Sequence, residues 1–465
     1  MNLAKRYIGI LGLGEAGMSA ARWLWSQGAD VVCIDDKPEQ EWKKDFLSWC
    51  RQNDIETIGS CSSQKVPSSL ELLVVSPGVP PYHMVVTNAV RKDIPVVGEL
   101  YLASSLWKGP LVGITGTNGK TTTTLLTGHI LEKGGLPVVR AGNISPPLFD
   151  LFHLNDGRTC GVLEISSFQL EYFPDFSVLD LKRPAFKAAV CLNVAPDHID
   201  RHGSVEEYKR AKEHLFSFQE KDSVAVLGPG AEEFKTVADR VFLRDMLIDE
   251  SSSTLTISLL GKDLRFDVSN WTLRGRHNME NLASAAVSAK VLGVGTGLIE
   301  KALSDFESPS HRMEEIGVFE GVTYFDDSKA TNLHAVVSGL GGLSRPVVLI
   351  AGGRAKGEDF SRLGQVLSSL GNGCGPQIKG VVLVGESAHE MASGLDGFFQ
   401  NICVIQGTCG ETVMEEAVRK ARTMAKLGDL IVLSPACASF DMFSSYRERG
   451  MAFKKAVKKI YGQER

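Results

Sequence analysis

The sequence lacks any long hydrophobic run. No stretch approaches the roughly 18 uninterrupted apolar residues that a membrane-spanning helix needs, so we expect no membrane span. The first residues, MNLAKRYIGILGLG, lead directly into a strand pattern and lack the apolar region and cleavage site of a secretory signal. We therefore expect a cytoplasmic location, and for the assembly state we expect a monomer.

Paired cysteines and basic runs are also missing. The nine cysteines are scattered, without a CxxC pair or a zinc-ligand spacing, so we expect reduced thiols. The net charge is −5 and no basic run occurs, which disfavours an extended nucleic-acid-binding surface. We expect no nucleic-acid partner, and anionic ligands must be held by local loops and single basic residues.

The chain has 465 residues of ordinary globular composition, with 43% hydrophobic and 23% charged residues. This length exceeds what one hydrophobic core supports. We predict an α/β fold of three domains: an N-terminal Rossmann-like domain over 1–95, a central P-loop ATPase with a parallel sheet over 96–308, and a C-terminal Rossmann-like domain over 309–465. The proline and polar residues at 308–310 predict a hinge.

Residues 109–130 read as a strand, a glycine-rich loop and a helix. The apolar run 109–114 precedes GTNGKT, and Leu125, Leu126 and Ile130 follow at helical spacing. Glycines let backbone N–H groups surround a polyphosphate, Lys120 can reach the β- and γ-phosphates, and the Thr121 hydroxyl can ligate Mg2+. The strict Walker pattern has glycine where Ile114 stands, and a turn that binds nothing is the alternative. The predicted phosphate-binding residues are Gly116, Thr117, Asn118, Gly119, Lys120, Thr121 and Thr122.

The N-terminal region has the pattern of a βαβ unit. A strand over 7–11 is followed by GLGEAG, a helix through 20–24 and a strand over 31–36 that carries Asp35. A GxGxxG turn lets a phosphate approach the backbone, and the acid can bind a ribose or sugar hydroxyl. A further strand over 72–75 ends at Ser76. These features fit NAD, FAD or a UDP-sugar, and glycines that only close tight turns are the alternative.

Polar residues follow two further predicted strands. The strand over 161–164 ends at Glu164, where a carboxylate can hold Mg2+, and the strand over 189–194 ends in APDHIDR, which includes His198. A helix over 205–218 carries Lys212 among other charged residues. Taken alone, these helical charges read as a solvated face.

Several motifs together resemble the Mur ligases of peptidoglycan synthesis. They are GTNGKTTT, ExSSFQLE, LNVAPDHIDRHGSVEEYKRAK, GRHNMEN, HRME, DDSKATN and LSPACASFD. These motifs follow one another in the same order as in the family, and the resemblance covers essentially the whole chain. SKATN and LSPACASFD resemble the D-glutamate-adding members, and the DNPR-type motif of the diaminopimelate-adding members is absent.

The resemblance implies an ATP-dependent ligase that adds D-glutamate to UDP-N-acetylmuramoyl-L-alanine through an acyl phosphate. The products would be ADP and phosphate, and the reaction would serve cell-wall synthesis, cell shape and cell division. ATP and Mg2+, at two sites, are the implied cofactors. The implied catalytic residues are Lys120, Glu164, His198 and Lys212. The implied magnesium ligands are Thr121, Glu164, His198 and Lys212, the last as a carbamate.

The remaining implied residues bind the three substrates. Besides the phosphate loop, ATP would contact Asn281, Arg312 and Asp327. The UDP-substrate would contact Leu13, Gly14, Glu15, Asp35, Asp36, Ser76, Asn143 and His198. D-glutamate would contact Lys329, Thr331, Lys356, Ser439 and Phe440. The chain departs from the family pattern at Ser145, where glycine is more usual, and at the pair Asp36 and Lys37.

Two other functions stay open at this point. A nicotinamide-dependent oxidoreductase would use GLGEAG and Asp35 but leaves GTNGKT unexplained. A non-catalytic P-loop regulatory ATPase leaves DDSKATN and LSPACASFD unexplained. Phosphate release from ATP that requires both a UDP-muramoyl substrate and an amino acid would distinguish the three.

Overall fold

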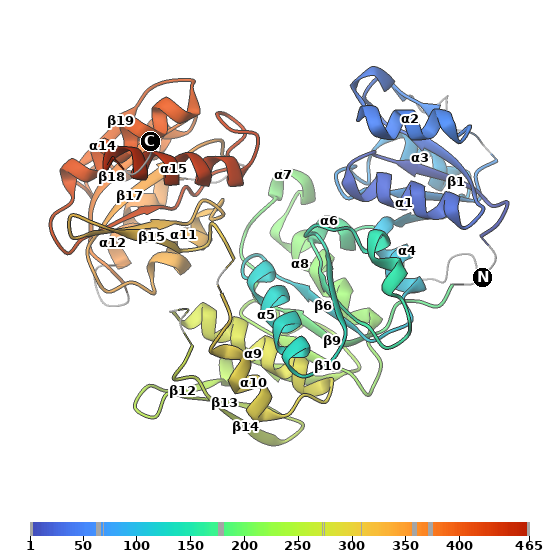
Figure 1. Ribbon diagram of the computed structural model, residues 1–465, viewed down its shortest axis with the longest axis horizontal. Coiled ribbons are helices and arrows are strands. Elements are labelled where there is room, and N and C mark those ends of the chain that lie inside the picture. Colours follow the sequence, from blue (N-terminus) through green and yellow to red (C-terminus); the bar gives the residue numbers. More distant parts are fainter. Residues whose placement is uncertain are drawn as a thin grey trace. The chain divides into compact units, whose positions relative to one another are not determined.

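The computed structural model describes residues 3–61, 67, 69–174, 181–271, 273, 275–307, 309–355, 360–370 and 375–462. Strands and helices alternate along the chain, and most strands lie in parallel sheets (Figure 1). The predicted α/β fold class is confirmed. The chain divides into two compact units, one made of Met1–Val194, Glu206–Trp271 and Glu280–Phe306, the other of Ala195–Val205, Thr272–Met279 and Glu307–Arg465.

The first sheet has the strand order β3-β2-β1-β4-β5, and all its pairs are parallel. The strands are β1 (Tyr7–Leu11), β2 (Asp30–Ile34), β3 (Glu56–Ile58), β4 (Leu72–Val75) and β5 (Val96–Gly98). Helices α1 (Glu15–Ser26), α2 (Lys44–Gln52) and α3 (Met84–Arg91) connect them. The order reverses between β1 and β4, so the loops at Gly12 and Ser76 meet at the edge where open α/β sheets bind ligands.

The second sheet has the order β11-β10-β9-β6-β8-β7 and is also parallel. Its strands are β6 (Leu111–Thr115), β7 (Val138–Gly142), β8 (Cys160–Glu164), β9 (Phe186–Cys191), β10 (Val224–Leu227) and β11 (Asp239–Phe242). In the register of the sheet, Ile114 of β6 lies opposite Glu164 of β8 and Val190 of β9. The carboxyl ends of these three strands therefore bring the phosphate loop, Glu164 and Asn193 to one edge.

Helices follow the strands of the first unit, and a small antiparallel sheet extends it; the first residue of α8 and the first turn of α9 belong to the second unit. The helices are α4 (Glu99–Leu106), α5 (Lys120–Lys133), α6 (Ser167–Leu170), α8 (Val205–Glu213), α9 (Arg276–Val291) and α10 (Thr296–Leu303). The small sheet contains β12 (Leu247–Asp249), β13 (Thr254–Leu259) and β14 (Lys262–Asp267), none of which was predicted. The helix predicted over 205–218 is wrong in its second half, because a 3-10 helix, η4 (His214–Phe218), follows α8.

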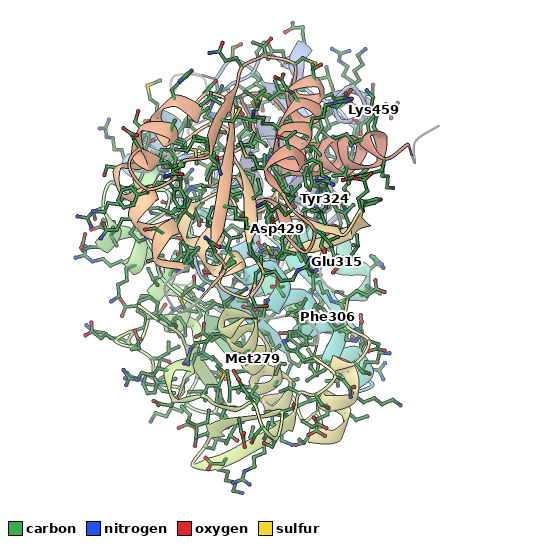
Figure 2. The ribbon with its side chains drawn as sticks, turned by 90° about the vertical axis from the view of Figure 1, so that its left-hand side faces the viewer. Met279, Phe306, Glu315, Tyr324, Asp429 and Lys459 are labelled. Atoms are coloured by element: carbon green, nitrogen blue, oxygen red, sulfur yellow. The ribbon has the colours of Figure 1, made fainter. Side chains whose placement is uncertain are left out.

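The second unit contains a sheet of order β15-β16-β20-β17-β18-β19. The strands are β15 (Glu314–Phe319), β16 (Val322–Asp326), β17 (Val347–Gly352), β18 (Ile378–Val384), β19 (Ile402–Ile405) and β20 (Leu430–Leu433). Its helices are α7 (Ile199–His202), α11 (Leu333–Leu340), α12 (Leu363–Leu370), α13 (Ala388–Leu395), α14 (Gly410–Met424) and α15 (Tyr446–Ile460). Only β15 is antiparallel to its neighbour. Figure 2 labels Tyr324, on β16, and Asp429, just before β20. The strands β16 and β20 are parallel neighbours in this sheet.

No helix in the described segments is long and apolar enough to cross a membrane. The domain boundaries at 95/96 and 308/309 stay predictions. Ser308, at the predicted hinge, lies outside the described residues.

Candidate active site

The glycines of the phosphate loop hold backbone conformations that other residues rarely adopt. Gly116 has a φ of 142° and Gly119 a φ of 85°. A Cβ at Gly119 would overlap Asn281 Oδ1 and lie 2.9 Å from a methyl group of Leu192. Helix α5 begins directly afterwards, at Lys120. The loop thus turns its backbone into the start of a helix, the geometry in which N–H groups and the positive end of the helix dipole bind phosphates.

Lys120 lies folded over the loop that precedes it. Its ammonium donates to Gly116 O at 2.7 Å and to Thr117 O at 2.8 Å. Asn118 N donates to the side chain of Asn193 at 2.9 Å, so the loop is braced from the end of β9. Thr121, in the first turn of α5, is partly exposed. A cation and a hydroxyl therefore stand beside backbone groups that can surround a polyphosphate.

Glu164 fits the metal-binding role expected of it. Its side chain is 3% exposed, and Oε1 accepts a hydrogen bond from Asn143 Nδ2 at 2.8 Å. Oε2 is buried and has no hydrogen-bond partner among the described residues. A buried carboxylate oxygen without a partner is costly, and a divalent cation would satisfy it. Asn143, expected at the UDP-substrate, thus also orients this carboxylate.

Lys212 is buried against the same loop. Its side chain is 1% exposed, its ammonium donates to Gly116 O at 2.9 Å, and it lies 4.4 Å from the centre of the Tyr208 ring. The Tyr208 hydroxyl is 3.1 Å from the Thr117 hydroxyl. The reading of this helix as an entirely solvated face is therefore wrong, because Tyr208 and Lys212, four residues apart, share the buried side of α8.

Asn281 contacts the loop through its side-chain oxygen. It is 4% exposed, and the Thr123 hydroxyl donates to its Oδ1 at 3.1 Å. Asn281 is therefore held beside Gly119 and the first turn of α5. Its expected contact with adenine stays a prediction.

Apart from Asn143 and His198, the residues expected at the UDP-substrate lie around the carboxyl ends of β1, β2 and β4. Asp35 accepts from Leu13 N at 2.6 Å and from Lys37 N at 2.9 Å, so its carboxylate fixes the turn after β1. The Ser76 hydroxyl donates to Gly12 O at 2.6 Å. These bonds join the tips of β1, β2 and β4 at the switch point of the sheet.

Three more residues expected at the UDP-substrate, Asp36, Glu15 and Gly14, lie near the same edge of the sheet. Asp36 is paired with His83, whose Nε2 is 3.1 Å from each carboxylate oxygen. Glu15, which follows the N-cap Gly14, accepts from the Ser145 hydroxyl at 2.7 Å. The role of His83 was missed, since the side chain is 47 residues from its partner and lies in no recognisable motif.

In the second unit, Asp327 lies just after β16. It accepts from Met313 N at 3.2 Å and from the Ser434 hydroxyl at 2.7 Å. Burial raises the pKa of Asp327 to about 7, while Ser434 and the charge of Arg312 act in the opposite direction. Arg312 and Asp327, both expected to bind the nucleotide, thus interact electrostatically.

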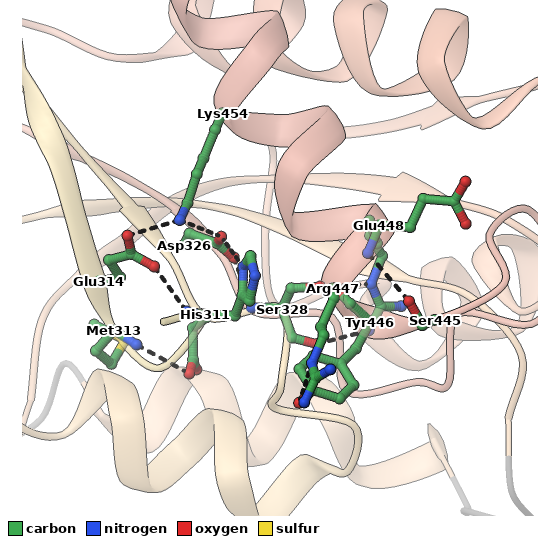
Figure 3. Close-up of polar contacts among 12 residues, drawn as sticks. His311, Met313, Glu314, Asp326, Ser328, Ser445, Tyr446, Arg447, Glu448 and Lys454 are labelled. Carbon is green, nitrogen blue, oxygen red and sulfur yellow. Dashed lines mark hydrogen bonds and ion pairs between the residues drawn. The ribbon is translucent and has the colours of Figure 1, made fainter. Parts of the chain in front are cut away.

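His311, Glu314 and Asp326 form a cluster beside this segment, with ligand-type atoms within 4.8 Å of one another. His311 Nδ1 lies 2.6 Å from Asp326 Oδ2, and the Lys454 ammonium lies 2.6 Å from Glu314 and 3.9 Å from Asp326 (Figure 3). Because an ammonium group already neutralises these carboxylates, we interpret the cluster as an ion-pair network that ties the HRME segment to α15.

The described residues expected at D-glutamate lie in loops that follow the strands of the second unit. The Lys329 ammonium is 3.9 Å from the centre of the Tyr446 ring. Thr331 is partly buried, Ser439 is 2% exposed and Phe440 is 64% exposed. Lys356 lies outside the described residues.

His198 also belongs to the second unit and is the N-cap of α7. Its backbone is left-handed, with a φ of 53°, and its ring lies 3.7 Å from Asp197. Asp197 accepts from Asn332 Nδ2 at 3.1 Å, and Asn332 also caps α11 by accepting from Ala335 N. The APDHIDR and SKATN motifs are therefore joined directly.

Family models and curated relatives that match this chain are all Mur ligases. Family models described as the Mur ligase MurD-like N-terminal domain, the Mur ligase middle domain and the Mur ligase glutamate ligase domain match residues 6–98, 114–289 and 311–437. A UDP-N-acetylmuramoylalanine--D-glutamate ligase of Koribacter versatilis is 35% identical over 100% of both chains. One of Nitrosospira multiformis is 36% identical over 99% of this chain and 97% of its own length.

Solved structures share the fold at lower identity. A pseudomurein peptide ligase from Methanothermus fervidus has a TM-score of 0.57 at 18% identity and covers 98% of this chain and 100% of its own. The MurF ligase of Thermotoga maritima in complex with ADP has a TM-score of 0.56 at 16% identity, covering 98% and 99%. Because its full-length relatives are more than 30% identical to it, this chain belongs to the Mur ligase family, and these relatives are the family's UDP-N-acetylmuramoylalanine--D-glutamate ligases.

Proposed function

We propose that this protein is the ATP-dependent ligase that joins D-glutamate to UDP-N-acetylmuramoyl-L-alanine in peptidoglycan biosynthesis. The observation that carries the proposal is the full-length identity with D-glutamate ligases. It is supported by a phosphate loop with two lysines bound to the Gly116 carbonyl. It is also supported by Glu164, whose buried Oε2 has no hydrogen-bond partner in the described part of the chain. The oxidoreductase and regulatory-ATPase alternatives are not supported by these comparisons.

The proposed reaction has two steps. The alanyl carboxylate of the UDP-substrate attacks the γ-phosphate of ATP, which gives an acyl phosphate and ADP. The amine of D-glutamate then attacks the acyl carbon, loses a proton and expels phosphate from the tetrahedral intermediate. In both steps several anions must meet, so positioning and electrostatic stabilisation dominate the catalysis.

Different residues of the chain bind the phosphate, the magnesium ions and the nucleotide. Lys120 and the backbone N–H groups after β6 hold the transferred phosphate. Glu164 and His198, with Thr121, are the proposed magnesium ligands, and bound Mg2+ would neutralise the phosphate charge. Arg312 and Asp327 hold the nucleotide. We assign the UDP-substrate to the domain over 1–95, the phosphates of ATP to the domain over 96–308, and D-glutamate to the domain over 309–465, which also supplies Arg312 and Asp327 to the nucleotide.

Lys212 is proposed to act as a carbamate. Carbamate formation requires a neutral amine, which burial favours. An ammonium group beside a magnesium ion would be repelled, whereas a carbamate is a carboxylate equivalent that attracts the ion or orients its water. The burial of Lys212 against Gly116 supports this role.

Phosphate release tests the proposed function. Purified protein with ATP and Mg2+ should release phosphate only when UDP-N-acetylmuramoyl-L-alanine and D-glutamate are both present. D-alanine, which lacks the second carboxylate, should not replace D-glutamate. Release that needs only ATP, or equal use of D-alanine, would contradict the proposal. The expectations of a cytoplasmic location and a monomer remain predictions.

A further inference from the structure

Arg449, on α15, is a buried arginine whose partners among the described residues are backbone carbonyls and one hydroxyl. It is 1% exposed, and burial lowers its pKa to about 10. Its guanidinium donates to Ser328 Oγ at 3.0 Å, Ser328 O at 2.8 Å and Cys437 O at 3.1 Å, with longer bonds to Ala438 O at 3.3 Å and Gly352 O at 3.5 Å. None of these partners is a carboxylate, so the charge is not buried to form an ion pair.

The groups that Arg449 binds come from three neighbouring strands. Ser328 follows β16, Gly352 ends β17, and Cys437 and Ala438 follow β20, which lies between the other two. The segments after β16 and β20 also carry Lys329 and Ser439, which are expected to bind D-glutamate. The guanidinium, with its planar set of donors, therefore fixes the separation of two amino-acid-binding loops.

Tyr446 lies one helical turn before Arg449, on the same side of α15. Its ring faces the Lys329 ammonium at 3.9 Å. Its carbonyl accepts a hydrogen bond from the Ser328 hydroxyl at 2.8 Å (Figure 3). The Arg447 guanidinium lies farther from the centre of this ring, at 5.8 Å, and its Nε donates to the Tyr446 hydroxyl at 3.3 Å. A lysine side chain has four rotatable bonds, and an aromatic face that attracts its ammonium restricts the positions it adopts.

We propose that Tyr446 and Arg449 are positioning residues of the amino-acid site, with Tyr446 orienting the Lys329 ammonium and Arg449 fixing the loops that bear Lys329 and Ser439. This inference rests on the proposed function, since the ligand is D-glutamate. Two carboxylates on one small molecule must meet groups from separate loops, so the spacing of those loops and the direction of Lys329 set the affinity. Neither residue touches the reacting atoms.

The test compares KM values for the three substrates in the full-length enzyme. Tyr446→Leu removes the ring and should raise KM for D-glutamate roughly three- to tenfold, while KM for ATP and for the UDP-substrate stays unchanged. Tyr446→Phe keeps the aromatic face and should restore the wild-type KM. The matched control is Lys458→Met, an exposed lysine of the same helix.

A double-mutant cycle shows whether Tyr446 acts through Lys329. On a Lys329→Met background, Tyr446→Leu should cause no further rise in KM for D-glutamate, because the group that it orients is gone. Arg449→Lys keeps the charge but loses the planar fork, and should raise KM for D-glutamate more than KM for ATP. If Arg449→Lys does not fold, the Tyr446 variants decide the test.

The outcomes separate the inference from the proposed function. A wild-type enzyme that uses D-glutamate, combined with an unchanged KM in Tyr446→Leu, equal rises for all three substrates, or additive effects with Lys329→Met, would overturn the inference alone. A wild-type enzyme with no D-glutamate-dependent turnover would overturn the proposed function and this inference with it.

Discussion

Replacing Glu99 by glutamine should stabilise the first unit at alkaline pH. Glu99 begins α4 and is 5% exposed. Gln169 Nε2 donates to its Oε1 at a long 3.4 Å, and its Oε2 has no hydrogen-bond partner among the described residues. Burial raises the pKa of Glu99 from 4.5 to about 7, and the contacts with Gln169 and with backbone N–H groups offset this only in part.

The direction of the pH dependence follows from that raised pKa. The unfolded chain loses this proton near pH 4.5, whereas the folded chain keeps it until about pH 7. The free energy of unfolding therefore falls as pH rises through this window, and the loss is complete above pH 7. The displaced pKa corresponds to about 3 kcal/mol at pH 8 and less than about 1 kcal/mol at pH 5. Glutamine has the same shape and no charge to lose.

Urea unfolding followed by tryptophan fluorescence measures this effect, because all six tryptophans belong to the first unit: Trp23, Trp25, Trp42, Trp49, Trp107 and Trp271. Relative to wild type, Glu99→Gln should gain about 3 kcal/mol at pH 8 and little at pH 5. The exposed Glu206→Gln serves as the control and should show no pH-dependent difference. A Glu99→Gln variant that gains equally at both pH values, or that is less stable than wild type at pH 8, would refute the reasoning.

Further predictions concern the reaction itself. Lys120→Ala should lower turnover by roughly 10² to 10³-fold with an unchanged circular dichroism spectrum, since one phosphate-binding cation is lost; near-normal ATP consumption would contradict the phosphate loop. Glu164→Gln should raise the Mg2+ concentration needed for half-maximal rate, and an unchanged requirement would remove it from the metal site. Because the pKa of Asp327 is raised to about 7, KM for ATP should fall between pH 6 and pH 8 as this acceptor ionises, and Asp327→Asn should flatten the profile. Lys212 should give a carbamate 13C signal after incubation with labelled bicarbonate, and a signal that persists in Lys212→Ala would reject the assignment.

Local patterns in the sequence were enough to predict the strands and loops that carry the site. The apolar run before GTNGKT is β6, and Gly116 and Gly119 of the loop have the positive φ angles that glycine permits. The order of the strands was not predictable, because every buried parallel strand has a similar apolar pattern. The antiparallel β12 to β14 sheet was missed, since β12 has only three residues and β14 is mostly exposed and polar.

Hydropathy patterns and spacing did not predict the contacts that depend on tertiary packing. Lys212 lies in a helix rich in charge, and only the packing of α8 shows that it is buried while Arg210 is not. Arg449 binds carbonyls as far as 121 residues away, and carbonyl acceptors carry no residue identity. His83 and Asp36 meet only because β2 and β4 belong to one sheet.

Oxygen transfer tests the central claim most directly, since the proposed enzyme activates a carboxylate by phosphorylating it. The measurement uses UDP-N-acetylmuramoyl-L-alanine labelled with 18O in its alanyl carboxylate, together with ATP, Mg2+ and D-glutamate, and mass spectrometry of the phosphate released. If an acyl phosphate forms, each phosphate should carry one 18O atom and the new amide should retain the other. Unlabelled phosphate, formed while D-glutamate is consumed, would contradict the account.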